Sequence, residues 1–154
     1  MAKVNFKITG MKELQKSLKA LGEVPQKHVT ASAKKGMSVV LQQAKSKAPV
    51  DTGMLRKGMK LVGERTKTKG KKVYQVDFDR AFNDIFQKRN KAGQIIAYYP
   101  VSQEYGYFTK NGRYIPGYRF TRGSLENNAP RVQQVIIGTM KQKIDSEIAK
   151  RGLK

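Results

Sequence analysis

Three acidic side chains are the residues of this sequence that could support metal-dependent or acid–base chemistry. Asp77 and Asp79 lie two positions apart, so in a strand both would point to the same face, and Glu104 follows further along the chain. Paired carboxylates can bind a divalent cation or act as general acid and base. The aspartates stand among lysines and Glu104 has no acidic partner nearby, so a solvated strand edge is the favoured interpretation.

Other reactive residue types are scarce. The chain has no cysteine, which excludes disulfides and thiolate chemistry, and a single histidine, His28, cannot form a histidine metal cluster. No Walker loop, dinucleotide fingerprint or zinc-ligand spacing is present in the sequence. We therefore expect a protein that is not an enzyme and that uses no cofactor and no metal.

Positive charge is the strongest feature of the composition. The chain has 32 lysines and arginines against 11 acidic residues, a formal net charge of +21, which attracts polyanions. The dense basic run comprises Lys67, Lys69, Lys71 and Lys72. A solvated loop is the usual interpretation of such a run, and contact with DNA or with an acidic protein neighbour is the alternative. Charge alone does not separate these cases.

Length and hydropathy indicate one globular domain over residues 1–154. Hydrophobic residues make up 38% of the chain, which is enough for a core. No apolar run reaches the length of a membrane span, and the first residues lack the apolar segment of a signal peptide. We expect a soluble protein that is made in a cytoplasm.

Hydrophobic spacing predicts the elements of the first third. Residues 3–9 alternate as a short strand, and a helix follows from residue 11 to Gly22. A second helix is predicted to begin at Pro25 and to reach Ala48. Small residues on this second helix, Gly36 among them, would let another element approach closely.

A helix stop and a helix start follow each other directly after this helix. Pro49 removes a backbone donor and pushes Ala48 out of the helical region, while Asp51 and Thr52 can cap the next element. Gly53 tolerates the backbone angles of a sharp turn. Local physics predicts a fixed corner. This corner motif consists of Ala48, Pro49, Val50, Asp51, Thr52, Gly53, Leu55 and Arg56.

The middle of the chain is predicted to contain hairpins. Residues 61–66 and 72–79 form two arms with a basic tip at residues 66–72, and residues 80–91 have helical spacing. A strand over residues 94–99 leads through Pro100 into a single helical turn. These predicted elements bring six tyrosines into one region, where they could stack on bases or, more simply, form a subunit interface: Tyr98, Tyr99, Tyr105, Tyr107, Tyr114 and Tyr118.

The last third combines a second hairpin with a long helix. Asn111 and Gly112 predict a type I′ turn between residues 107–110 and 113–115. Asn128 is predicted to cap a final helix that ends near Gly152. The fold class is therefore α+β, an antiparallel sheet with long N-terminal and C-terminal helices packed on one face.

The corner motif resembles the signature of a family of small tail-component proteins of long-tailed bacteriophages, usually called head–tail joining or tail-completion (neck) proteins. In that family a long helix ends in Ala-Pro-Val-Asp-Thr-Gly, followed by a small or apolar residue, Leu and Arg. Met54 occupies the variable position here, and Lys57-Gly58 replaces the more usual basic residue and serine.

Further segments support the resemblance. Residues 10–14 are similar to the family's entry into a Leu-rich helix, and residues 98–106 to its Tyr-Ala-x-x-x-Glu-Tyr-Gly segment. Residues 116–125 match the family's entry into the last helix more loosely. Residues 80–94 have no counterpart and are interpreted as an insertion.

The resemblance implies a non-enzymatic virion protein that assembles in the host cytoplasm. Such proteins form rings, usually of six subunits, between the head-closure (stopper) ring and the tail-terminator ring, and they surround the channel for genomic DNA. The implied partners are further copies of the chain, the head-closure protein, a tail-terminator or tail-tube protein and DNA, with no membrane. Candidate interface residues are Tyr98, Tyr99, Glu104, Tyr105, Gly106 and Phe120.

Two alternatives come from the residues themselves. A basic DNA-binding protein without enzymatic activity would also explain the net charge and the lysine-rich tip. An enzyme with Asp77, Asp79 and Glu104 around a metal ranks well below both other hypotheses.

Overall fold

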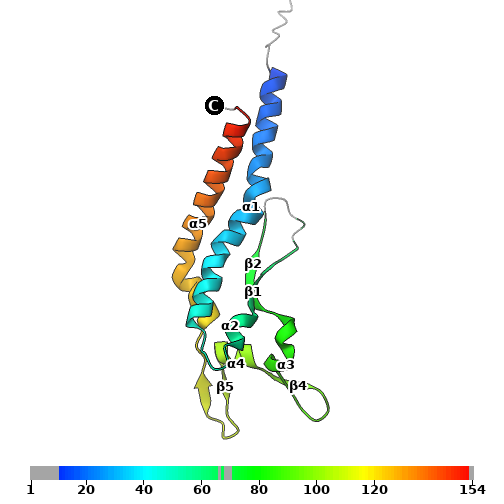
Figure 1. The fold of residues 1–154 in the computed structure, drawn as a ribbon, viewed down its shortest axis with the longest axis vertical. Helices are drawn as coiled ribbons and strands as arrows, with labels where there is room; N and C mark the ends of the chain where they lie inside the picture. Colours follow the sequence, from blue (N-terminus) through cyan, green and yellow to red (C-terminus); the bar gives the residue numbers. More distant parts are fainter. Residues whose placement is uncertain (1–10, 66, 68–70, 153–154) are drawn as a thin grey trace, which may run out of the picture.

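Two long helices lie side by side and carry a group of short elements at one end (Figure 1). The computed structural model describes residues 11–65, 67 and 71–152, so the strand predicted over residues 3–9 lies outside the described part. In chain order the elements are α1 (Met11–Lys47), α2 (Met54–Gly58), β1 (Met59–Gly63), β2 (Tyr74–Phe78), η1 (Arg80–Phe82), α3 (Asn83–Phe86), β3 (Gln87–Arg89), β4 (Ile95–Tyr98), α4 (Tyr99–Tyr105), β5 (Gly106–Phe108), β6 (Tyr114–Pro116) and α5 (Phe120–Lys150).

The first helix is continuous where two helices were predicted. Helix α1 runs for 37 residues through Gly22 and Pro25, so the predicted break is wrong. An interior proline removes one backbone hydrogen bond and costs a helix about 3 kcal/mol, but hydrophobic helical spacing continues on both sides of it. The predicted end of the helix is confirmed, since the backbone N–H of Ala48 makes the last helical bond, to the carbonyl of Ala44 at 2.9 Å.

A glycine sets the distance between the two long helices. Gly36 of α1 is buried, and a Cβ atom added to it would overlap Ile136 Cγ1 of α5 and lie 3.3 Å from the carbonyl oxygen of Val132. The predicted close approach of another element to the small residues of α1 is therefore confirmed, and that element is α5.

The last helix begins earlier than predicted. Helix α5 starts at Phe120, so Asn128 is not its cap and Pro130 lies in its interior. The side chain of Asn128 donates to the carbonyl oxygen of Ser124 instead, at 2.8 Å. The start of α5 is stabilised by a side chain from another element, which the local sequence does not reveal. Its predicted end is confirmed, because Gly152 adopts a left-handed φ of 64°.

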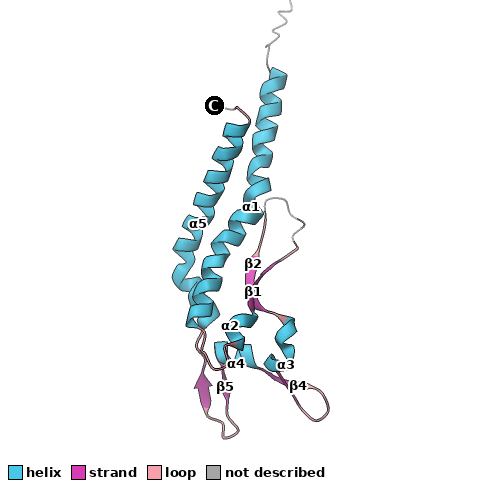
Figure 2. Cartoon of the chain, viewed as in Figure 1, coloured by secondary structure: helices cyan, strands magenta, loops and turns pink. Residues whose placement is uncertain are grey.

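The α+β class is confirmed, but the strands form three separate two-stranded antiparallel sheets where one sheet was expected (Figure 2). Strands β1 and β2 pair from Met59 opposite Phe78 to Gly63 opposite Tyr74, and α1 packs against both. The other two sheets pair β3 with β4 and β5 with β6. Short helices interrupt the chain between these hairpins, so each strand pairs with its neighbour in sequence.

The turn between β5 and β6 has a different type from the predicted one. A type I′ turn needs positive φ at both central residues, whereas here Gly112 has a φ of 75° and Asn111 is not in that region. The N–H of Gly112 donates to Thr109 at 3.0 Å, so the turn spans residues 109–112. The hairpin itself is confirmed.

None of the described helices is long and apolar enough to cross a membrane.

Candidate functional site

The corner motif joins α1 to α2 through one left-handed glycine. Gly53 has a φ of 75° and occupies the N-cap position of α2, where no side chain accepts a hydrogen bond. The predicted capping by Asp51 and Thr52 is therefore wrong, and both side chains are exposed. A Cβ atom at Gly53 would meet nothing within 4 Å, so conformation and not space favours glycine here.

Arg56 closes the C-terminal end of α1. Its Nε and Nη2 donate to the carbonyl oxygen of Ala48 at 3.3 and 2.9 Å, and Nη2 also donates to that of Ser46 at 3.2 Å. The last carbonyl groups of a helix lack intrahelical partners, and a cation at that end complements the helix dipole. The arginine of the motif is thus a positioning residue that fixes the direction in which the chain leaves α1.

A shared hydrophobic core lies beneath the corner. It contains Ala44 and Ala48 from α1, Leu55 from α2, Met59 from β1 and Phe120 from α5. Phe78 of β2 meets Phe120 edge to face, with ring centroids 6.4 Å apart. Phe120 is 1% exposed, so the first residue of α5 is anchored in the same core as the corner motif.

Glu104 holds the start of α5 from the neighbouring helix α4. Its side chain is buried, Oε2 accepts from the backbone N–H of Thr121 at 2.8 Å, and Oε1 accepts from that of Arg122 at 2.9 Å. The backbone N–H of Arg119 donates to the carbonyl oxygen of Glu104 at 3.0 Å. The free N–H groups and positive dipole of a helix N-terminus favour a carboxylate. Both oxygens of the predicted functional acid therefore bind the chain's own backbone.

Glycines allow the Glu104 segment to lie against the chain that leads into α5. Gly106 has a φ of 92°, and its N–H ends α4 by donating to the carbonyl oxygen of Ser102. A Cβ atom at Gly117 would overlap the carbonyl oxygen of Glu104 and the nitrogen of Gly106. The two backbones are in direct contact, which brings Glu104 within reach of the helix.

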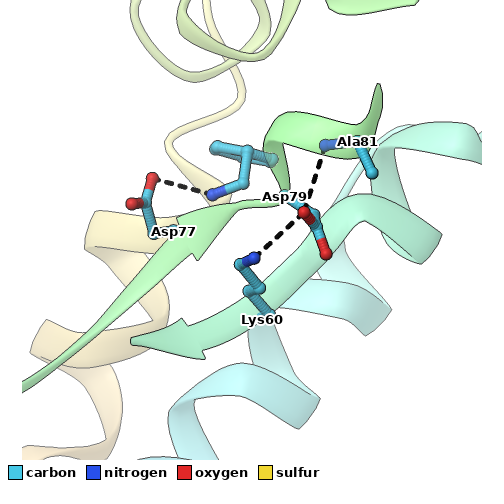
Figure 3. A network of polar contacts seen from close by, with 5 residues as sticks. Lys60, Asp77, Asp79 and Ala81 are labelled. Carbon is cyan, nitrogen blue, oxygen red and sulfur yellow. Dashed lines mark hydrogen bonds and ion pairs between the residues drawn. The ribbon is translucent and has the colours of Figure 1, made fainter. Parts of the chain in front are cut away.

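The aspartates examined as a metal or acid–base pair take part in local structure (Figure 3). Asp79 Oδ1 lies 3.0 Å from Lys60 Nζ and accepts from the backbone N–H of Ala81 at 3.1 Å, which caps η1. Hydrogen bonds from Lys60 and then from Ala81 lower the pKa of Asp79 below its ordinary value. Asp77 accepts from the N–H of Phe78 at 2.8 Å. In the described part of the chain no three His, Cys, Asp or Glu residues form a group that could hold a metal.

The predicted basic tip lies between β1 and β2. Lys67 and Lys71 are exposed, whereas Lys69 lies outside the described residues. Lys72 Nζ donates to the carbonyl oxygen of Glu64 at 2.7 Å and lies 5.7 Å from the ring centre of Tyr74. Its ammonium group is therefore already engaged with the hairpin.

The structure separates the predicted interface residues into buried and exposed ones. Glu104 and Phe120 are buried inside the chain, and Tyr98 and Tyr99 are half-buried, which raises the pKa of both phenols. Tyr105, at 58% exposed, is free to meet a neighbour. Sequence reasoning gave no role to exposed Phe108, although its place in a hairpin next to a turn is a usable signal. Contact of these residues with a partner stays a prediction.

Comparison with known proteins identifies one family. Residues 12–81 match the family described as "Bacteriophage HK97-gp10, putative tail-component". The matched segment covers most of α1, the corner motif, α2 and the β1–β2 hairpin, and the resemblance to phage tail components is thereby confirmed for this part. No curated protein and no solved structure matches the chain. The family indicates a structural protein of a phage tail and therefore a place in the virion.

Proposed function

We propose that this phage tail component is a ring subunit of the virion neck, which joins the head to the tail and surrounds the channel through which DNA leaves. The tail-component family is matched over residues 12–81. The finer assignment to the neck rests on the corner motif and on residues 98–106, which resemble tail-completion proteins. A ring of six is expected, between the head-closure ring and the tail-terminator ring or tail tube.

One observation carries this proposal. The two segments that resemble neck proteins are the segments that hold the long helices in place: Arg56 binds the end of α1, and Glu104 binds the start of α5. Both segments meet at the core that contains Leu55 and Phe120, since Leu55 belongs to the corner motif and Tyr99 of residues 98–106 packs against this core. The motif residues thus set the relative position of the two long helices, as expected for a subunit that presents fixed surfaces to its neighbours.

The same contacts favour a structural role over an enzymatic one. Both oxygens of buried Glu104 accept from backbone N–H groups, so this carboxylate has none left for a substrate, and Asp79 Oδ1 is bound by Lys60 and Ala81. A general base needs a free oxygen within reach of a substrate proton. We propose that the chain is not an enzyme and requires no cofactor.

A rotationally closed ring needs two different complementary patches on each subunit. The long α1–α5 pair and the hairpins at its end give an elongated subunit with well-separated surfaces (Figure 1). We assign ring closure and the axial contacts to different parts of this shape, so that one subunit can touch a copy of itself, the head-closure ring and the tail.

Deletion of the gene tests the neck assignment. We expect full heads and separate complete tails in lysates of the deletion phage, and restoration of infectious particles when the purified chain is added. Purified wild-type virions should contain the chain in a few copies per particle. Its absence from purified virions, or normal joined particles without the gene, would overturn the proposal.

A DNA-binding role is the second candidate, favoured by the net charge of +21 and by exposed Lys67 and Lys71. Contacts with phosphates alone weaken steeply with salt. Gel-shift titrations across salt concentrations decide this point, because sequence-selective binding that persists at physiological salt would support the second candidate over the neck subunit.

A further inference from the structure

Exposed apolar side chains are concentrated at one end of the molecule. We call residues 80–122 the hairpin end, since they include the β3–β4 and β5–β6 hairpins with α4 between them. Of the twelve large hydrophobic side chains exposed among the described residues, nine belong to it: Ile85, Ile95, Ile96, Val101, Tyr105, Tyr107, Phe108, Tyr114 and Tyr118. Exposed apolar groups gathered in this way mark interaction sites.

A groove on the hairpin end could receive a side chain of a partner. It has a volume of about 560 Å³, and Ile85, Ala97, Tyr99 and Tyr107 are among its lining residues. On the β5–β6 hairpin, Phe108 projects from β5 with 73% of its surface exposed, the largest exposed fraction among these apolar residues. An apolar groove and an exposed aromatic residue on the same end of the molecule are features from which protein–protein hot spots are built.

The same surface is strongly basic. The hairpin end contains only two acidic residues, Asp84 and Glu104, and the second is buried with both oxygens bound to α5. Its eight basic residues are Arg80, Lys88, Arg89, Lys91, Lys110, Arg113, Arg119 and Arg122. A partner must therefore offer negative charge around an apolar centre if the two potentials are to be complementary.

We propose that the hairpin end docks on another virion protein that presents an acidic rim around an apolar patch. This inference rests on the proposed function and extends it by giving the chemistry of the axial neighbour. The hairpin end of a second copy does not fit this description, because it is equally basic. Like charges brought together at an interface are unfavourable.

Nucleic acid fits the surface less well than protein does. The ring centroids of Phe108 and Tyr114 lie 5.2 Å apart with the rings tilted by 49°, so the pair presents no common flat face to a base. The hydroxyl of Tyr114 donates to the carbonyl oxygen of Tyr105 at 2.5 Å, which fixes this arrangement. Aliphatic Ile95 and Ile96 complete the surface, and aliphatic side chains provide no stacking platform.

Photo-crosslinking in phage-producing cells tests the proposal. The photoreactive residue p-benzoylphenylalanine replaces Phe108 in the full chain, and in a control it replaces Ile137, which is 57% exposed on α5. Each of these two chains is also made with Lys110→Glu, in the turn between β5 and β6. A further version carries Lys141→Glu on α5 instead, which makes the same change of charge away from the hairpin end. Mass spectrometry identifies the crosslinked peptides.

We expect position 108 to crosslink to an acidic segment of a different virion protein. Lys110→Glu should reduce this yield by about tenfold and Lys141→Glu should leave it unchanged, because charge reversal at a complementary interface costs affinity. A crosslink to a second copy of the chain, to nucleic acid or to nothing would overturn the inference, and so would a yield that is insensitive to Lys110→Glu. The proposed function fails separately, if the chain is absent from purified virions.

Discussion

Glu104 Oε2 accepts a hydrogen bond from the backbone N–H of Thr121 at 2.8 Å, although 17 positions of sequence separate the two residues. Through this contact, a residue of the short helix α4 provides the cap that α5 lacks in its own sequence, since no side chain caps at Arg119. The start of the last helix is therefore determined by the tertiary fold. Damage to this contact should loosen α5 without touching its hydrophobic residues.

Removal of the carboxylate should destabilise the chain measurably. Glu104→Ala leaves the part-buried N–H groups of Thr121 and Arg122 without their acceptor, which should lower the free energy of unfolding by about 1–3 kcal/mol. Urea unfolding followed by circular dichroism measures this change. Glu126→Gln is the matched control, because Glu126 is exposed and paired with Arg122 on the same helix, and it should change the midpoint much less. Equal effects of the two variants would contradict the capping role.

Arg56 should matter through its shape as well as its charge. Arg56→Ala should cost about 1–3 kcal/mol, since the carbonyl oxygens of Ser46 and Ala48 lose a charged donor. The stability of Arg56→Lys should lie between that of Arg56→Ala and that of the native chain, because an ammonium group lacks the planar fork that reaches both carbonyl oxygens. Denaturant midpoints give the ranking. If Lys57→Ala, an exposed change one position away, proved as costly as Arg56→Ala, the specific role of Arg56 would be wrong.

The contact at Gly36 predicts a reversal of the usual helix rule. Glycine to alanine within a helix normally stabilises by up to about 1 kcal/mol. Gly36→Ala should instead destabilise by about 1–3 kcal/mol, because the new methyl group overlaps Ile136. Gly138→Ala on α5, where a Cβ meets nothing within 4 Å, should follow the usual rule. Thermal unfolding of both variants checks the signs, and a stabilising Gly36→Ala would show that the helices are further apart.

The Gly36 contact can be tested further by shortening its partner. Ile136→Ala alone creates a gap and should destabilise the chain. Added to Gly36→Ala, it should cost less than it does alone, because the new methyl group then fills part of that gap. Purely additive effects would argue against direct contact between the two positions.

The ion pair of Asp79 predicts a pH dependence with a definite sign. The pKa of Asp79 is lowered in the folded chain, so the folded state gains stability above the ordinary carboxyl pKa and loses it as pH falls through the lowered value. Carbon-detected NMR titration of the carboxyl group measures the pKa. Lys60→Ala should raise it toward the ordinary value, because the largest cause of the shift is the hydrogen bond from Lys60. No rise in the variant would refute that cause.

Local signals in the sequence were sufficient for some elements. Pro49 ends α1 where expected, the helical turn predicted after Pro100 is α4, and the α+β class follows from alternating and helical hydrophobic spacing. Each of these features depends on residues within a few positions. The β1–β2 hairpin was also predictable, because Tyr74 and its alternating neighbours describe one half-buried strand.

The remaining errors have a non-local cause. Asn128 was a plausible cap, yet Glu104 and Phe120 anchor the chain earlier and extend α5 through Pro130. Periodicity likewise could not reveal that Arg56 turns back to bind Ala48. In both cases the deciding contact joins segments whose proximity arises only in the folded chain. The sequence motifs therefore located the candidate site, but only the structure revealed which backbone groups Arg56 and Glu104 bind.

A reconstruction of the neck in intact virions by electron cryo-microscopy tests the central claim most directly. The neck-subunit hypothesis predicts a closed ring of this chain, six copies by its family resemblance, between the head-closure ring and the tail, with the α1–α5 pair and the hairpin end resolved in each subunit. The basic hairpin end should face an acidic neighbour. A reconstruction in which every density at the head–tail junction is accounted for by other proteins would contradict it.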